Sequence, residues 1–152
     1  MVKALVQRVS EAAVHVAEAR VGAITAGLLV FLGVEQGDTK EQADWLVEKI
    51  VGLRIFPDHD KPMNRSVLDT GGALLVVSQF TLAADTSRGK RPSFGTAASP
   101  EIARELYDYF VTSARQFLSV QTGQFGADMQ VHLVNDGPVT FWLERQAVQH
   151  QI

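Results

Sequence analysis

The chain has 152 residues, 46% of them hydrophobic, which is typical of one domain with its own core. Its net charge of −3 argues against nonspecific coating of nucleic acid, because Lys and Arg supply most of that binding, but leaves contact with one RNA end open. Without cysteine there is no disulfide framework or thiolate metal site. Because no apolar run approaches the ~20 residues of a membrane helix, and the N-terminus lacks the apolar stretch of a signal peptide, we expect a soluble cytoplasmic protein.

Short apolar runs separated by glycines fill the first third of the chain and recur later, a pattern typical of strands. These runs predict strands over residues 3–9, 14–16, 21–24, 28–32, 73–77, 129–134 and 139–143. We expect the first four to form an antiparallel meander. The last two are expected to flank a Gly-Pro turn.

Two segments carry the start signals and apolar spacing of helices. Thr39 with Gln42 three residues later is a capping-box pattern, and the apolar positions after it predict a helix over 40–53. Ser99 before Pro100 marks the start of a second helix. Its apolar stripe is predicted to contain Ile102, Leu106, Phe110 and Phe117.

Two polar stretches are expected to be loops. Residues 57–62 combine Pro, Asp and Lys and predict an exposed loop. Residues 84–98 are rich in Gly, Ser, Thr and basic residues, and loops of that length without their own structure are uncommon unless they bind something. Three of the 14 basic residues of the chain, Arg88, Lys90 and Arg91, lie there, so a local phosphate contact is one interpretation and a solvated loop the other.

The hydroxyl groups of Ser78 and Thr81 are the candidate nucleophiles, and they follow directly after the apolar run at 73–77. A Ser or Thr attacks only when a base takes its proton. The segment 78–82 contains no His, Asp, Glu or Lys, and no G-x-S-x-G elbow surrounds Ser78. Asp85 is near in sequence, but the sequence does not give its distance in space.

The histidines do not supply the missing base. His15 and His132 alternate with Val and Leu in strands, His59 lies in a polar loop and His150 in the tail. Asp58, His59 and Asp60 lack the partner cluster that a metal site needs. We therefore predict a site without a protein acid or base, a metal or a cofactor.

Two motifs, Ser78-Gln79-Phe80-Thr81-Leu82 and Gly137-Pro138-Val139-Thr140, resemble the two signature motifs of the D-aminoacyl-tRNA deacylases, SQFTL and GPVT. The resemblance covers nearly the whole chain, because further segments match the family at 7–9, 27–30, 86–94, 106–110, 122–125 and 128–131. An extra proline at position 62 and a tail over 145–152 are the visible departures. Neither touches a signature motif.

The predicted elements and the resemblance together imply an α+β fold in a single domain over residues 1–152. Mainly antiparallel or mixed sheets would form a barrel-like core with two main helices packed on it. The resemblance implies a carboxylic ester hydrolase that edits D-aminoacyl-tRNA, releasing the free D-amino acid and tRNA, and that also cleaves glycyl-tRNA. Of the two interpretations of the basic residues in the loop 84–98, the resemblance favours contact with RNA phosphates.

In the family the RNA assists its own hydrolysis, because the ribose hydroxyl next to the ester helps to activate water. The protein then orients the ester and stabilises the oxyanion, a task that suits backbone N–H groups. The resemblance places these groups along Gln79, Phe80 and Thr81, with the side chains of Ser78 and Gln79 holding the adenosine or supporting the loop. Phe80 is either part of this site or a core aromatic residue.

The resemblance assigns chirality selection to Gly137 and Pro138. In the family their peptide bond is cis, and the pair enters the active site of the other protomer of a homodimer, where it leaves no room for an L side chain. Sparing L-aminoacyl-tRNA by ~10⁴-fold takes ~5.5 kcal/mol, which a rigid backbone clash can supply. An ordinary trans turn between two strands is the alternative.

Two other functions remain open from the residues alone. Thr81 could act as a nucleophile on the same substrates. Alternatively, the chain could be a noncatalytic module that binds tRNA ends or proteins.

Overall fold

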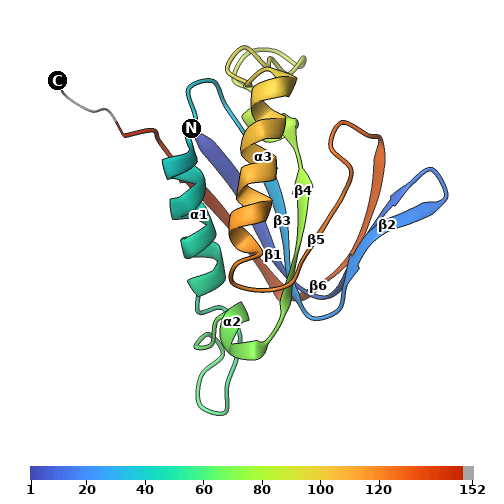
Figure 1. Cartoon of the computed structure of the whole chain (residues 1–152), viewed down its shortest axis with the longest axis vertical. Helices are drawn as coiled ribbons and strands as arrows, with labels where there is room; N and C mark the ends of the chain where they lie inside the picture. Colours follow the sequence, from blue (N-terminus) through green and yellow to red (C-terminus); the bar gives the residue numbers. More distant parts are fainter. Residues whose placement is uncertain (149–152) are drawn as a thin grey trace.

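The computed structural model of the protein describes residues 1–148, and one mixed sheet organises them (Figure 1). Its strands are β1 (Val2–Val16), β2 (Ala19–Ile24), β3 (Gly27–Gly33), β4 (Ala73–Ser78), β5 (Val120–Thr122) and β6 (Met129–Arg145). The order is β2-β1-β3-β4-β5, and β6 pairs with β1. The β3–β4 and β4–β5 pairs are parallel and the others antiparallel, so the α+β fold with a mixed sheet is confirmed. The tail from residue 149 on, with His150, lies outside the described residues.

The first four predicted strands do not form a meander. β1 is one continuous strand that contains the predicted strands 3–9 and 14–16. Its first half pairs with β3 and its second half with β2, so β1, rather than β2, lies at the centre. The prediction was wrong because a strand of 15 residues is long enough to pair with two partners placed end to end.

Both faces of the sheet are buried. Leu28, Val30, Leu74 and Val76 point to a core cluster shared with the helices, whereas their neighbours Leu29, Leu75 and Val77 point to a second cluster inside the curl of the sheet. Near-continuous apolar runs at 28–32 and 73–77 are therefore required, because strands buried on both faces have no solvent side.

The strand β6 also differs from the prediction. Its two halves were predicted as separate strands around a Gly-Pro turn, but both pair antiparallel with β1 in the same direction. The register shifts between Gln7 and Val9, where Val9 pairs with Asn135 and Gln7 pairs with Thr140. The segment 136–139 is therefore a bulge opposite Arg8 that points away from the ladder, and not a hairpin turn.

Two longer helices, α1 (Lys40–Gly52) and α3 (Pro100–Ala114), and the short α2 (Val67–Thr70) pack against the sheet (Figure 1). The capping residues act as predicted, since Gln42 Oε1 accepts from Thr39 N at 2.7 Å and Ser99 Oγ from Ile102 N at 3.4 Å. The predicted stripe of α3 is only partly right, because Ile102 is exposed and Phe117 lies beyond the end of the helix. The buried face is Leu106, Tyr107, Phe110, Val111 and Ala114. No helix within residues 1–148 is long and apolar enough to cross a membrane.

The two edges of the curled sheet meet at Gly22. A Cβ atom on Gly22 would lie 2.2 Å from the carbonyl oxygen of Thr122 in β5, so only glycine lets β2 approach β5 this closely. We expect Gly22→Ala to destabilise the protein by about 1–3 kcal/mol in urea unfolding, because the edges must separate. Gly52→Ala is the matched control, since nothing lies within 4 Å of its Cβ position. Equal stability of the two variants would show that the edges do not need this contact.

Candidate active site

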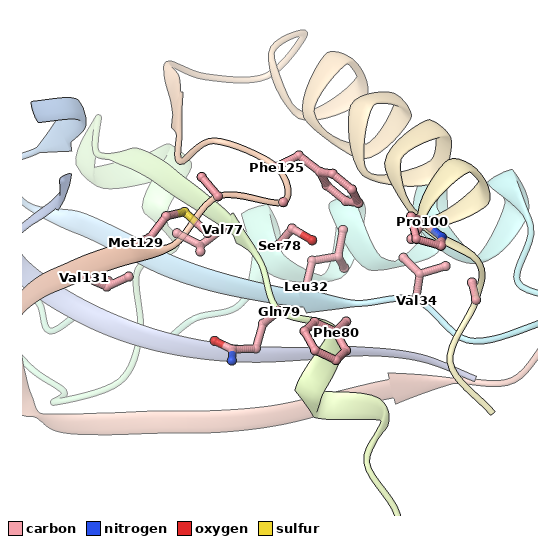
Figure 2. A pocket seen from close by; sticks show the side chains of 14 residues that line it. Leu32, Val34, Val77, Ser78, Gln79, Phe80, Pro100, Phe125, Met129 and Val131 are labelled. Carbon is pink, nitrogen blue, oxygen red and sulfur yellow. The ribbon is translucent and has the colours of Figure 1, made fainter. Parts of the chain in front are cut away.

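A cavity of about 460 Å³ lies where β3 and β4 end (Figure 2). The segment after β5 and the start of α3 complete it. Its walls are formed by Leu32, Val34, Val77, Ser78, Gln79, Phe80, Ala98, Pro100, Ala103, Phe125, Gly126, Ala127, Met129 and Val131. None of these residues titrates, so the polar side chains that this part of the chain offers are one hydroxyl and one amide.

The end of β4 holds the first signature motif in place. Gln79 N donates to Leu32 O at 2.8 Å, which continues the pairing of β3 and β4 by one residue. Tyr107 of α3 donates its hydroxyl to Val76 O at 2.8 Å, and burial raises the pKa of this phenol to about 12. Figure 2 shows the side chain of Ser78 between Phe125 and Leu32, directed into the cavity. The strand end that carries Ser78 is therefore held by hydrogen bonds to β3 and to α3.

The hydroxyl of Thr81 has an amide partner and no base. Gln79 Nε2 donates to Thr81 Oγ1 at 2.5 Å, and Thr81 is exposed and does not line the cavity. Asp85 is exposed, and hydrogen bonds from the side chain and backbone of Ser87 hold the pKa of its carboxyl below the ordinary value. Asp85 Oδ1 accepts from Ser87 N at 2.9 Å, and no hydrogen bond within residues 1–148 joins its carboxyl to Ser78 or Thr81.

The backbone turns sharply after Gln79 into the 3₁₀ turn η1 (Phe80–Ala83). Its first hydrogen bond runs from Leu82 N to Gln79 O at 3.2 Å. Within residues 1–148, the N–H groups of Phe80 and Thr81 have no backbone acceptor. Phe80 is 60% exposed and lines the cavity, which rules out the core position that the sequence left open.

The Gly137–Pro138 peptide bond is cis, as the resemblance implied. Arg8 lies opposite this bulge, and its Nε donates to Asp136 O at 3.0 Å while its Nη1 donates to Ile55 O at 2.7 Å. Asn135 Oδ1 accepts from Val139 N at 3.1 Å on the other side. The bulge is therefore tied to β1 and to the segment after α1.

The structure does not bring the two signature motifs together within one chain. Gly137 and Pro138 do not line the cavity. Val131, the last residue of β6 that does, precedes Gly137 by six residues, or ~20 Å of extended strand. The bulge is therefore not part of this cavity within one chain.

The three basic residues Arg88, Lys90 and Arg91 also lie outside the cavity, in an exposed loop. Two backbone hydrogen bonds between Asp85 and Ser93, of 2.7 and 2.9 Å, close this loop. Apart from Thr81, which lies beside the cavity without lining it, the predicted site residues thus form three groups: the cavity wall, the β6 bulge and the basic loop.

The described histidines stand apart from the cavity. The rings of His15 on β1 and His132 on β6 meet edge to face with centroids 5.0 Å apart, and neither residue lines the cavity. Asp58 is engaged within its own loop, where Oδ1 accepts from Asp60 N and Lys61 N at 2.8 and 2.7 Å. No group of three His, Asp or Glu residues with metal-binding geometry occurs within residues 1–148.

Among the residues of these groups that were not predicted as site residues, Phe125 and Arg8 are the most informative. Phe125 is the second aromatic residue of the cavity wall, besides Phe80. It follows the short strand β5, whose parallel pairing with β4 cannot be predicted from a local pattern. Arg8 is largely buried, with 11% of its side chain exposed. A charged residue within a predicted strand was the available signal.

Comparisons with known proteins show which family the chain resembles. The family model described as D-Tyr-tRNA(Tyr) deacylase matches residues 5–144. The chain is 61% identical to a D-aminoacyl-tRNA deacylase of Geotalea uraniireducens (strain Rf4), covering 93% of this chain and 92% of that one. It is 59% identical to a D-aminoacyl-tRNA deacylase of Escherichia coli O81 (strain ED1a), covering 93% and 98%.

Solved structures show the same fold. A structure titled c-Myc DNA Unwinding Element Binding Protein superposes with a TM-score of 0.90 at 40% identity, covering 95% of this chain and 99% of that one. A structure titled as a probable eukaryotic D-amino acid tRNA deacylase has a TM-score of 0.80 at 17% identity, covering 93% and 98%, and supports the fold alone. With the family model and both signature motifs matched over most of its length, the chain belongs to the D-aminoacyl-tRNA deacylase family.

Proposed function

We propose that this protein hydrolyses the ester bond of D-aminoacyl-tRNA and releases the free D-amino acid and tRNA. The observation that carries the proposal is the cavity at the end of β4, which joins the first signature motif to an apolar, aromatic wall and contains no titratable side chain. Its volume is in the range of small-molecule sites, and apolar walls with few polar groups suit a nucleobase. The terminal adenosine occupies it in this proposal.

Hydrolysis proceeds without a protein nucleophile. Water attacks the ester carbonyl, the neighbouring ribose hydroxyl helps to activate that water, and the amino acid leaves as the carboxylate while the ribose oxygen regains a proton. Two features support this route, namely the absence of a titratable group from the cavity wall and the amide partner of the Thr81 hydroxyl. The N–H groups of Phe80 and Thr81 are the proposed donors to the oxyanion.

Selection against L-amino acids falls to the bulge that carries Gly137 and Pro138, supplied by the second protomer of a homodimer. The contacts of Arg8 with Asp136 and Ile55 support a rigid element, since they fix the backbone just before the glycine. The distance along β6 between bulge and cavity supports action across subunits. Glycyl-tRNA passes the same filter because glycine has no side chain to exclude.

The basic loop supplies phosphate contacts outside the cavity. Arg88, Lys90 and Arg91 are exposed, and no ion pair with a carboxylate engages them within residues 1–148. Such free cations suit the RNA backbone. In this proposal the enzyme works in the cytoplasm, where aminoacyl-tRNA is found.

A second candidate function is binding of nucleic acid without catalysis. It is favoured by one observation, a 40% identical protein of the same fold that is named as a DNA unwinding element binding protein. The basic loop would serve either function. The cavity beside the first signature motif supports the enzyme, because it offers a site for the end of the substrate that carries the ester.

One assay tests the proposal against this alternative. Purified protein is incubated with D-tyrosyl-tRNA and L-tyrosyl-tRNA, and the ester that remains is measured over time. We expect the D-ester to be hydrolysed about 10⁴-fold faster than the L-ester. This ratio of rates corresponds to a difference of ~5.5 kcal/mol in activation free energy. Equal survival of both esters would reject the enzyme and leave the binding module.

A further inference from the structure

Two phenylalanine rings stand together on the surface at the mouth of the cavity. Phe80 is 60% exposed and Phe94 is 38% exposed, and their ring centroids are 5.1 Å apart at an interplanar angle of 52°. Phe80 lines the cavity and Phe94 does not. The pair therefore extends the aromatic wall of the cavity outwards across the surface.

The backbone around Phe94 is fixed rather than loosely placed. On one side, Ser93 pairs with Asp85 through two backbone hydrogen bonds, and on the other, Ala97 N donates to Phe94 O at 3.1 Å. Gln36, just after β3, reaches across with Nε2 donating to Gly95 O at 3.2 Å. Two adjacent, partly exposed aromatic rings held in position beside a cavity form a small apolar patch, and such patches can mark binding sites.

The charge beside this pair indicates what kind of ligand it takes. The loop that ends at Phe94 contains Arg88, Lys90 and Arg91 against one carboxylate, Asp85, so it is locally positive in a chain of net charge −3. Aromatic rings next to cations are the arrangement with which proteins bind single-stranded nucleic acid, since the bases stack and the phosphates meet the cations.

We propose that Phe94 is a stacking site for the nucleobase immediately 5′ of the terminal adenosine, with the phosphates on its 5′ side directed to the basic loop. The inference rests on the proposed function, which places the adenosine in the cavity. Phe80 then separates two adjacent base positions, one inside the cavity and one on Phe94. The subsite recognises a π-face, so it accepts any base.

The test is a double-mutant cycle between protein and substrate. The two substrates are D-tyrosyl esters of the dinucleotide cytidylyl-adenosine and of the same dinucleotide with an abasic 5′ residue. With the wild type, removing the base should raise KM by about 5- to 150-fold, the range measured for single stacked bases, and leave kcat within about twofold. Phe94→Leu should raise KM for the intact dinucleotide by a similar factor.

The effect of Phe94→Leu on the abasic substrate shows whether the ring acts through the base. If the ring acts through the base, Phe94→Leu should have no further effect on the abasic substrate, and Phe94→Trp should restore the low KM. Phe117→Leu is the matched control, because Phe117 is also exposed, at 47%, but lies past the end of α3 and outside the cavity. Phe117→Leu should not change the KM for either substrate.

Three outcomes would overturn the inference. Additive effects of Phe94→Leu and base removal would mean that ring and base act independently. A change in oligomeric state of Phe94→Leu, measured by light scattering, would mean that a second copy of the chain covers the ring. Equal KM of the wild type for both dinucleotides would show that no base is bound there. Failure of the wild type to cleave D-tyrosyl-tRNA at all would instead reject the proposed function itself.

Discussion

Gly137→Ala is expected to lower the preference for D-tyrosyl-tRNA over L-tyrosyl-tRNA by about 10²-fold or more. Gly137 has φ +134°, and a Cβ atom there would lie 2.6 Å from Val139 Cγ2 and 3.1 Å from Arg8 Nη2. The bulge and the Arg8 contacts must therefore shift, and an exclusion that depends on fixed backbone carbonyls weakens when their position changes. Initial rates of deacylation with both esters measure the ratio.

Gly71→Ala is the matched control for this experiment. Gly71 also has a positive φ, of +70°, so alanine is strained there too, but nothing lies within 4 Å of its Cβ position and it is neither in the cavity wall nor in a signature motif. We expect Gly71→Ala to lower the free energy of unfolding and to leave the ratio of D-ester to L-ester hydrolysis unchanged. Pro138→Ala provides a second variant of the bulge. An unchanged D to L ratio in both Gly137→Ala and Pro138→Ala contradicts the selecting role of this element.

Replacing the 2′-hydroxyl of the terminal adenosine by hydrogen is expected to slow hydrolysis of a 3′-linked D-tyrosyl ester by about 10²- to 10⁴-fold, the usual contribution of general acid–base groups. The cavity wall provides no titratable side chain to replace that hydroxyl. Single-turnover rates at saturating enzyme isolate the chemical step from binding. The intact ribonucleotide ester, prepared in the same way, is the control.

Thr81→Ala and Ser78→Ala complete the test of this mechanism. Each is expected to leave measurable turnover, because neither hydroxyl has a base as its partner, and Thr81 Oγ1 accepts from Gln79 Nε2. A stable acyl-enzyme adduct on Thr81 would revive nucleophilic catalysis. Full activity on the 2′-deoxy substrate would equally count against assistance by the RNA.

Local signals in the sequence predicted most of the elements. The helix α1 begins after Thr39 and α3 after Ser99, because capping and helical spacing depend on residues three or four positions apart. The runs at 28–32 and 73–77 became β3 and β4 for a similar reason, since a short, unbroken apolar run is also a local signal. These predictions did not need to know which elements touch.

Predictions that depended on partners were less successful. The meander failed because β1 exchanges β3 for β2 halfway along its length, and the Gly-Pro turn proved to be a bulge because both halves of β6 pair with the same strand. Ile102 was assigned to the core, but the face of α3 that meets the sheet excludes it. Each error concerns pairing between segments far apart in the sequence.

The same division holds for the site. Both signature motifs could be read from the sequence because they are matters of residue type and order. The tertiary structure decided that Phe80 faces solvent at a cavity, that Phe125 and Met129 complete its wall, and that Arg8 holds the Gly137–Pro138 bulge. These positions depend on the register of β6 on β1 and on the parallel pairing of β5 with β4, which are set by packing across the whole sheet and leave no local pattern.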